Sequence, residues 1–428
     1  MTETSLHTLL DRFAELCMTF SSVARHILVL SIGAIGIVAV PACSGQPAAT
    51  VPPVSLAERT SQAAPTNTEQ AARAAGSPAV PLQLVQSNVA TAATESFKFL
   101  TAPVVYNENV PSLAVGPDGN LYYPGPSTGG TLPVVVQYQP ATGQSSLFSP
   151  SQTVAYKLDY TFAGAGNGPN GEIWLGSYSC YLVSMTTAGD FAIHEVAYPS
   201  ASCAYAETAF GTTIGDRVWF TAQVTADKVL YYVGYFDVTE KKSKVFKVGP
   251  ISARYCGYQI SNIVQGPDGN FWFGDGPYVG RVTPAGSVHL FTSPLASVCQ
   301  VLSGPDGNIW YLGANSGVDG FGVMGTQGND IATVLNTTGI FYELTNGPDG
   351  NIWVTGTDGL GGENAGIYKI SVANQKYKFY PFPKPEDQKI LPIDIITGPN
   401  NNLWFDTEQR GSGTTPDTHG LGMVVSGR

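Results

Sequence analysis

Tyrosine and glutamate side chains gather in the loops of one predicted face of this chain, and these residue types suit a binding surface. Aromatic rings cover apolar and sugar-like groups, while carboxylates accept hydrogen bonds. We expect a small molecule, a glycan or a peptide as the ligand. The candidate ligand-binding residues are Tyr205, Glu207, Tyr255, Tyr258, Tyr278, Tyr342 and Glu343. The alternative is that a chain with 21 tyrosines shows them on every surface.

Acid–base chemistry on that face has one candidate, His419, because His194 and His289 fall on predicted outer strands. A lone loop histidine is often incidental, so this role needs a partner. Other chemistries lack their motifs: the chain has no GxSxG elbow, no Walker loop, no HExxH zinc motif and no dinucleotide fingerprint.

Four cysteines also fall in loops of the same face. Cys180, Cys203, Cys256 and Cys299 predict two disulfides in an exported body, for which three connectivities exist. We favour Cys180 with Cys203 and Cys256 with Cys299. Metal ligation is the rival interpretation, but no CxxC pair occurs.

A seven-residue repeat must position all of these side chains. Its copies are GPDGNLY at 116, GPNGEIW at 168, GPDGNFW at 266, GPDGNIW at 304 and 347, GPNNNLW at 398, and a worn TIGDRVW at 213. The aromatic anchors that end the copies run from Tyr122 to Trp404 with a mean spacing of about 47 residues, and periods of about 40 to 50 are typical of propeller blades.

Each copy predicts a hairpin turn. Pro suits the second turn position, and the last Gly suits a left-handed conformation. The repeated Asp118, Asp268, Asp306 and Asp349 are therefore interpreted as turn formers rather than metal ligands. The strands before and after the turn, here named A and B, are followed by strand C and an outer strand D, with the aromatic anchor buried between blades.

Counting strands predicts how the ring closes. The chain ends after a seventh C strand, LGMVVSG, and the body begins with an unpaired D strand, SFKFLTAP at 96–103. We expect that strand to complete the last of seven four-stranded blades. The loops from D to A and from B to C share the candidate face.

Composition fits this all-β class. The chain has 49 Gly and 30 Pro among 428 residues, and only 12% of its residues are charged. Gly and Pro are poor in helix interiors, and an average protein has about 25% charged residues. The net charge of −11 argues against a nucleic-acid partner, because an acidic surface repels phosphates.

The N-terminal region predicts export. Residues 1–43 are interpreted as a signal peptide, whose apolar run 27–42 follows Arg25 and His26. Residues 40–43 (VPAC) resemble a bacterial lipobox, which makes Cys43 the predicted lipidation site; plain secretion and an uncleaved anchor are the alternatives. Residues 44–94 are expected to form a disordered Ala/Pro/Ser/Thr-rich tether, and residues 95–428 the propeller. The expected location is extracytoplasmic, as a cell-envelope lipoprotein or a secreted protein.

The GPDGNIW and GPDGNFW turns, the strand VGRVTPAG and the outer strand SVHLFTSP closely resemble the virginiamycin B lyase (streptogramin B lyase) family over residues 95–428. The resemblance implies a seven-bladed β-propeller. It also implies Mg²⁺-dependent opening of a cyclic depsipeptide by eliminative cleavage of its ester bond, with a His base and metal-binding Glu side chains on one face.

The catalytic positions that the resemblance requires are not matched. In the family, a Pro-His pair often stands about eleven positions before the Trp, and the following strand often ends Trp-Phe-Thr-Glu. The equivalent eleventh positions here are Pro111, Ala163, Thr208, Ser261, Cys299, Tyr342 and Ile393. Three positions after the anchors, Asp275 is the only carboxylate, and Glu408 lies one residue late.

The leading hypothesis is thus an exported propeller that binds a ligand or partner, with degenerate catalytic positions. The alternative is a divergent metal-dependent carbon–oxygen lyase or hydrolase acting on a cyclic depsipeptide or similar ester. In that case His419 is the base, Asp275, Asp406 or Glu408 holds the metal, and Mg²⁺ is the cofactor. A third hypothesis is a purely structural surface propeller. We expect a monomer that meets the membrane only through its N-terminal anchor.

Overall fold

The computed structural model describes residues 85–86, 96–100, 113–125, 132–158, 162–199, 206–225, 229–249, 262–315, 317–335, 339–358, 364–373, 376–383, 389–410 and 418–425. The predicted signal peptide, and the predicted tether apart from Val85–Gln86, lie outside these ranges. In the described part of the chain, no helix is long and apolar enough to cross a membrane.

Antiparallel strands, paired in chain order, make up nearly all of the described structure. One sheet contains β3 (Ala114–Val115), β4 (Leu121–Gly125), β5 (Val134–Gln139) and β6 (Gln144–Phe148). The next strands are β7 (Phe162–Asn167), β8 (Ile173–Ser177), β9 (Tyr181–Met185) and β10 (Phe191–Glu195). They are followed by β11 (Ala206–Ile214), β12 (Arg217–Thr225), β13 (Val229–Asp237) and β14 (Lys242–Lys247).

The second half of the chain repeats this pattern. Two further sheets contain β15 (Ile263–Gln265), β16 (Phe271–Asp275), β17 (Tyr278–Val282) and β18 (Val288–Thr292), and β19 (Ser297–Ser303), β20 (Ile309–Asn315), β21 (Val318–Met324) and β22 (Asp330–Leu335). Then come β23 (Ile340–Asn346), β24 (Ile352–Thr357), β25 (Ala365–Ser371) and β26 (Lys376–Pro381). The last sheet contains β27 (Lys389–Thr397), β28 (Leu403–Arg410), β29 (Thr418–Val425) and the N-terminal β2 (Ser96–Leu100).

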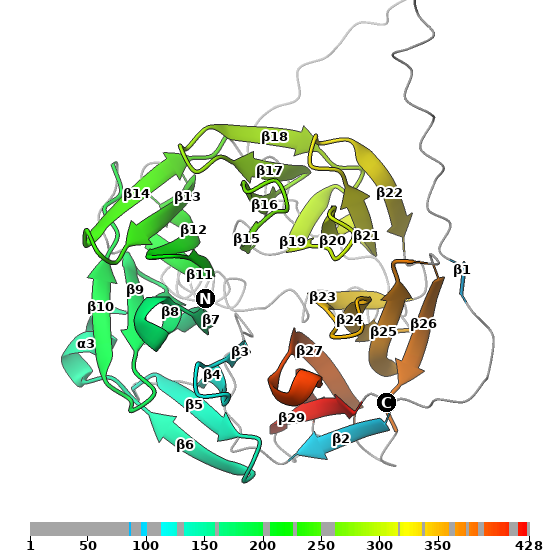
Figure 1. The fold of residues 1–428 in the computed structure, drawn as a ribbon, viewed down its shortest axis with the longest axis horizontal. Coiled ribbons are helices and arrows are strands. Elements are labelled where there is room, and N and C mark those ends of the chain that lie inside the picture. Colours follow the sequence, from blue (N-terminus) through cyan, green and yellow to red (C-terminus); the bar gives the residue numbers. More distant parts are fainter. Residues whose placement is uncertain are drawn as a thin grey trace, which may run out of the picture. The chain divides into compact units, whose positions relative to one another are not determined.

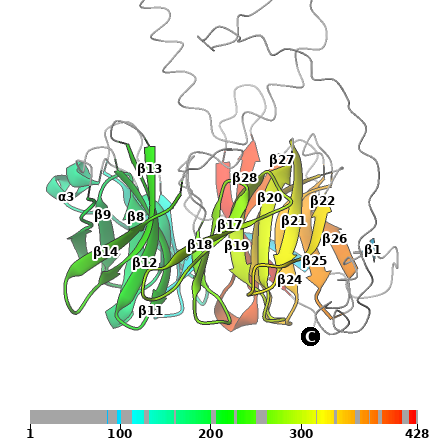
Figure 2. The same ribbon diagram turned by 90° about the horizontal axis from the view of Figure 1, so that it is seen from above.

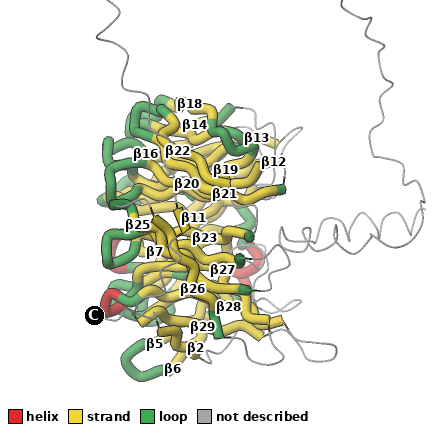
Figure 3. The backbone as a smooth tube through the Cα atoms, turned by 90° about the vertical axis from the view of Figure 1, so that its right-hand side faces the viewer, coloured by secondary structure: helices red, strands yellow, loops and turns green. Residues whose placement is uncertain are grey.

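The sheets follow one another around a common centre, with the first strand of each group innermost and the fourth outermost (Figure 1). Seen from above, strands of neighbouring sheets run side by side (Figure 2). Most of the described loops lie along one edge of the sheets, at the left in Figure 3. This arrangement agrees with the predicted all-β propeller class.

Two features depart from simple four-stranded sheets. The backbone pairing of Thr208 with Ser177 joins β7–β10 and β11–β14 into one eight-stranded sheet. The strands approach closely there, because a Cβ on Gly176 would lie 2.1 Å from the carbonyl oxygen of Thr208. In addition, β1 (Val85–Gln86) adds a parallel strand to the outer edge of β26.

One short helix, α3 (Gln152–Lys157), interrupts the β pattern between β6 and β7. Ser151 precedes it with an extended backbone, and its hydroxyl accepts a hydrogen bond from the Val154 amide, which is an N-cap. Single turns of 3-10 helix, η1 (Pro169–Gly171) and η3 (Pro399–Asn401), replace the usual turn in the two repeat copies that carry Asn instead of Asp.

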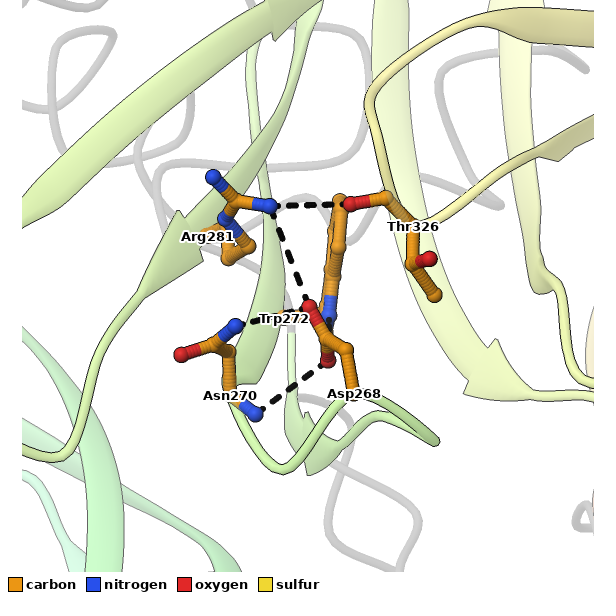
Figure 4. A network of polar contacts seen from close by, with 5 residues as sticks. All are labelled: Asp268, Asn270, Trp272, Arg281 and Thr326. Carbon is orange, nitrogen blue, oxygen red and sulfur yellow. Dashed lines mark hydrogen bonds and ion pairs between the residues drawn. The ribbon is translucent and has the colours of Figure 1, made fainter.

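The repeated turn has the predicted geometry, and its aspartate has a structural task. In the copies with Asp-Gly, the last Gly is left-handed, as at Gly269, where φ is 75°. Asp268 accepts hydrogen bonds from the Asn270 amide and from the Trp272 indole at 3.2 and 3.0 Å, and it pairs with Arg281 at 3.8 Å (Figure 4). Arg281 also donates to the Thr326 carbonyl of the next sheet at 2.8 Å. The turn therefore fixes the tryptophan that follows it.

The tryptophan anchors form the core, as the sequence predicts. Trp174, Trp219, Trp272, Trp310 and Trp353 are all fully buried. Trp219 packs against the sheet that follows it in the chain, where it stacks on Phe271 with ring centroids 3.7 Å apart. The divergent copy at 213 thus keeps this packing although Gly215 stands where the other copies have the turn Asp.

Candidate ligand-binding site

Irregularities in the inner strands decide which side chains reach the neighbouring inner strand. Register shifts occur in β7, β11, β19, β23 and β27. Such shifts place extra residues on one strand and re-aim their side chains. In β23 Tyr342 and Glu343 lie opposite the single residue Thr355, and in β27 Ile393 and Asp394 lie opposite the single residue Asp406.

A belt of polar side chains at this level ties the start of β15 to β19, and β19 to β23. Asn262 holds the backbone of Val301 with two hydrogen bonds of 2.9 and 3.0 Å. Gln300 likewise forms two hydrogen bonds with the backbone of Leu344, of 2.7 and 3.3 Å. These amides replace the backbone ladder that two inner strands of different sheets do not form, so the belt holds the sheets together near their centre.

The belt ends in three carboxyls, Glu343, Asp394 and Asp406, which we name the acidic cluster. Gln300 Nε2 donates to Glu343 Oε1 at 2.5 Å, and the side chains of Glu343 and Asp394 share a hydrogen bond. Asp394 accepts from the amides of Leu113 and Ile395, the second at 2.7 Å. Asp406 accepts from the Asp394 amide at 2.6 Å. Every member of the cluster is therefore engaged by protein donors.

Burial raises the pKa of all three carboxyls. For Glu343 the charges of Asp394 and Asp406 raise it further, and for Asp406 the charge of Asp394 does so. The pKa of Tyr123 is also raised, first by burial and then by Asp406, which places this phenol close to the cluster. Carboxylates that lie close together in the interior raise one another's pKa, which accounts for these directions.

A second polar group lies in the β11–β14 part of the eight-stranded sheet. Glu207, Gln223 and Tyr231 are successive partners across β11, β12 and β13. The Tyr178 hydroxyl hydrogen-bonds with Glu207, and burial raises the Glu207 pKa to about 7. The Oε1 atoms of Glu207 and Gln223 are buried and have no hydrogen-bond partner. Two acceptor atoms of this group therefore lack a hydrogen-bond donor.

Asp275, at the end of β16, faces the same interface. On this strand Phe271 and Phe273 pack against Trp219 and Tyr231 of the preceding sheet, and Asp275 is the next residue on that face. Its side chain is fully buried, and neither carboxyl oxygen has a partner. Burial raises the pKa of Asp275 to about 7. We name Glu207, Gln223 and Asp275 the orphan-acceptor site.

The residues predicted from the sequence fall into several places. Glu207 and Asp275 belong to the orphan-acceptor site, and Glu343 and Asp406 to the acidic cluster. Tyr278 opens β17 opposite Asp275. Tyr342 lies beside Glu343 in the irregular part of β23. Tyr205, Tyr255, Tyr258 and Cys43 lie outside the described residues.

The predicted base, His419, pairs with Glu408 in the backbone register of β29 and β28, and Asp406 lies two residues before Glu408. The side chains of His419 and Glu408 lie outside the described part. Two other histidines are on outer strands, as predicted: His289 on β18, and His194 on β10, where it stacks on Trp174 with ring centroids 4.4 Å apart. Burial lowers the pKa of His194 to about 4.

The predicted cysteine pairs are only partly visible. Cys180 and Cys299 are disulfide-bonded, while Cys203 and Cys256 lie outside the described ranges. The proposed connectivity therefore stays a prediction. Among the described residues, no group of three or more His, Cys, Asp and Glu side chains is arranged to hold a metal ion.

Sequence reasoning missed Gln223, Gln300 and Asp394. A signal for the last two exists, because the belt residues stand ten positions before their anchors. They are Asn262 before Trp272, Gln300 before Trp310, Glu343 before Trp353 and Asp394 before Trp404. Gln223 lies within an apolar strand, RVWFTAQVT, and no spacing marks it.

Comparisons with known proteins give structural relatives only. No family model and no curated protein matches the chain. A streptogramin B lyase structure is similar with a TM-score of 0.55 and 16% identity over 78% of this chain and 98% of that one. A catalytically inactive virginiamycin B lyase from Staphylococcus aureus with quinupristin is similar with a TM-score of 0.55 and 15% identity, over 77% of this chain and 99% of that one. The extracellular domain of a putative hybrid two-component system from B. thetaiotaomicron is similar with a TM-score of 0.50 and 16% identity, over 78% of this chain and 41% of that one. This chain therefore has a virginiamycin B lyase-like propeller fold.

Proposed function

We propose that this protein is an exported, seven-bladed propeller that binds a ligand at the inner ends of its sheets and does not run the lyase reaction. The observation that carries the proposal is Asp275, a fully buried carboxyl with no partner for either oxygen. A buried acceptor without a partner costs about 1 to 3 kcal/mol, so a ligand that supplies the donor would relieve this cost.

Seven blades and a closed ring are part of the proposal. The repeat has seven aromatic anchors, each at the start of a B strand. Trp404, the last anchor, clusters with Leu121 and Tyr138 near the beginning of the body. The pairing of β2 with β29 and the hydrogen bond from Leu113 to Asp394 support closure between the two chain ends.

Binding is favoured over catalysis by what the acidic side chains do. The lyase-like positions before the anchors carry no His. The three carboxyls nearest one another are engaged by Gln300 and by backbone amides, so they act as belt residues. The described residues offer no set that fits a Mg²⁺ ion.

Export is the second part of the proposal. A signal at residues 1–43, with lipidation at Cys43 or plain secretion, would place residues 95–428 outside the cytoplasm on a tether of residues 44–94. Disulfide bonds at Cys180 and Cys299 are compatible with an oxidising compartment. One structural relative is itself an extracellular domain.

Quinupristin tests this function directly, since a structural relative was solved with it. The purified full chain is incubated with quinupristin and Mg²⁺, and the ring-opened product is sought by mass spectrometry. We expect no product. In parallel, a thermal-shift screen of amines, sugars and short peptides is expected to yield a stabilising ligand whose effect is lost in Asp275→Asn and kept in the exposed-site control Glu195→Gln. Mg²⁺-dependent product, or a screen without any Asp275-dependent ligand, would contradict the proposal.

A divergent metal-dependent carbon–oxygen lyase or hydrolase is the second candidate. It is favoured by one observation, the backbone register that sets His419 opposite Glu408 on neighbouring strands. If this candidate is right, ester cleavage requires Mg²⁺ and falls at least about 100-fold in His419→Ala, the usual size of a general-base effect. Cleavage that persists in His419→Ala would exclude His419 as the base.

A further inference from the structure

We propose that a proton shared within the acidic cluster fastens the last sheet to its two neighbours, and that release of this proton loosens the joint. Glu343 belongs to the β23–β26 sheet, and Asp394 and Asp406 belong to the last sheet. The Leu113 amide, which donates to Asp394, lies just before β3 of the first sheet. Such a pH-sensitive joint is independent of the proposed ligand binding, because it needs no ligand.

Amide side chains of the belt hydrogen-bond with both polar groups of one backbone residue. Asn262 Oδ1 accepts from the Val301 amide, and Asn262 Nδ2 donates to the Val301 carbonyl. Gln300 forms the same two bonds with Leu344. In both cases the residue that is held stands nine positions before the next anchor. An amide can form this pair of bonds because it carries an acceptor and a donor on one side chain.

Carboxyl side chains occupy the next two places in the belt. By the same spacing, Glu343 should hold Ile395, and Asp394 should hold Leu113. Asp394 does accept from the Leu113 amide, but it also accepts from the Ile395 amide at 2.7 Å. Glu343 instead forms a hydrogen bond with the Asp394 side chain. The belt therefore passes through a contact between two carboxyls at this point.

A contact between two carboxyls needs a proton to be attractive. An ionised carboxylate only accepts hydrogen bonds, whereas a protonated one has an O–H donor. Both Asp394 oxygens accept from backbone amides, and Glu343 Oε1 accepts from Gln300. A protonated Glu343 then supplies an O–H donor to Asp394, just as the Gln300 nitrogen supplies a donor to Glu343.

The charges that act on this contact are negative. Within the described part of the chain, the charges that shift the pKa values of the cluster come from Asp394 and Asp406, and none comes from a lysine or an arginine. Asp406 accepts from the Asp394 amide at 2.6 Å, so it is part of the same joint. Loss of the proton therefore leaves like charges together without a cation, which is unfavourable.

The strands around the cluster carry other titratable groups. Tyr342 on β23 and Tyr123 on β4 are phenols, which ordinarily titrate at about pH 10, and burial raises the pKa of Tyr123. Lys369 on β25 is engaged by Asp349 at 2.8 Å. His419 lies on β29, the strand next to β28, and histidines titrate near neutral pH, so it needs a control variant.

The direction of the pH effect follows from the raised pKa values. Burial and the charge of Asp394 raise the pKa of Asp406 from 3.8 to about 8, so the folded chain keeps a proton that the unfolded chain releases. The contribution of the cluster to stability is therefore full below about pH 4 and is lost as the pH rises through about 8. Glu343 and Asp406 are only half-buried, so protons can exchange with solvent.

Hydrogen exchange with mass spectrometry on the full chain tests the joint at pH 6 and pH 9, after correction for the intrinsic exchange rate at each pH. The reporter is β27, which contains the Asp394 and Ile395 amides held by the cluster. The control is β19, where the neutral Asn262 holds the Val301 amide. We expect the protection of β27 to fall at least about tenfold relative to β19, the change that one pH unit above a single pKa produces.

Glu343→Gln separates the proton from the hydrogen bonds. Glutamine keeps an acceptor for Gln300 and brings its own N–H donor for Asp394, so the relative loss in β27 should shrink to less than about threefold. His419→Gln and the exposed-site variant Glu195→Gln should keep the full loss.

Circular dichroism at both pH values shows whether each variant is folded. If Glu343→Gln is not, Asp406→Asn takes its place, because it removes a charge and keeps an acceptor for the Asp394 amide. Equal changes of protection in β27 and β19 of the natural chain would overturn the inference. A full loss in the folded variant that lacks the carboxyl would overturn it too, as would a loss that disappears in His419→Gln.

Discussion

The acidic cluster and the orphan-acceptor site use the same side-chain chemistry in opposite ways. In the acidic cluster, Asp394 accepts from two backbone amides and Glu343 from Gln300. In the orphan-acceptor site, Asp275 accepts from nothing. Both groups are buried carboxyls with a raised pKa. Their number of donors, and not their acidity, separates a structural carboxyl from one that is free to bind.

This difference predicts opposite responses to mutation. Removing a carboxyl that satisfies backbone amides leaves those amides unpaired in the interior, which is destabilising. Removing a carboxyl that has no partner takes away a buried group that stabilises nothing. Measurements of unfolding free energy can therefore test the difference between the two groups of carboxyls, without knowledge of the ligand.

Asp394→Ala gives the largest expected effect. It leaves the Leu113 and Ile395 amides without their acceptor, so the free energy of unfolding should fall by about 3 kcal/mol. Urea denaturation followed by tryptophan fluorescence measures it. The exposed turn variant Asp190→Ala is the control and should change stability by less than about 1 kcal/mol. A similar loss of unfolding free energy in both variants would mean that the buried Asp394 stabilises the chain no more than an exposed turn aspartate does.

The pH dependence of stability is the next effect in size. Because burial raises the pKa of Asp275 from 3.8 to about 7, the folded chain binds more protons than the unfolded chain in this window. Stability is then full below about pH 4 and declines as pH rises through 7; this single carboxyl gives a decline of about 2 to 3 kcal/mol between pH 5 and pH 8. Denaturation curves at both pH values check it. A flat profile, or a rising one, would contradict the buried state of Asp275.

Gln300→Leu tests the belt with a smaller effect. The change removes the two hydrogen bonds to Leu344 and the one to Glu343, while leucine keeps much of the volume. We expect a loss of about 1.5 kcal/mol in unfolding free energy. Asn262→Leu, one sheet earlier, should behave alike, because its two bonds to Val301 are equivalent. A neutral result in both variants would show that the belt contributes no net stability.

Asp275→Asn should show the smallest effect and the opposite sign. The amide avoids burying a charge, so at about pH 8 unfolding free energy should rise by about 1 kcal/mol. The variant should also flatten the pH profile described above. If Asp275→Asn destabilises the chain as Asp394→Ala does, the distinction between the two regions is wrong.

Much of the fold follows from the repeated turn. Gly269 at positive φ, the buried Trp272 and the strands on either side are all properties of one short segment, and local properties can be seen in a sequence. The pairing of β2 with β29 was also predictable, because an unpaired strand remained at each chain end. The helix α3 was not predicted, since it lies in a loop between repeats.

The candidate sites were harder to predict for a physical reason. A register shift adds residues to one strand, so counting back from Trp404 to an eleventh position finds Ile393 and misses Asp394 next to it. Asp275 and Glu207 were both predicted as functional residues, but their common interface depends on which faces of two sheets meet. That is a tertiary property, and no motif in either strand records it.

The bond between each turn aspartate and its own tryptophan makes the repeated segment self-sufficient. Asp268, Asp306 and Asp349 each hold the indole four residues later, so a copied segment brings the fastening of its tryptophan with it. Each copy of the segment therefore orients its own tryptophan for packing, without help from the rest of the chain. The stacking of Trp219 on Phe271 shows that a tryptophan can be held without this bond, because the copy at 213 has Gly215 at the aspartate position.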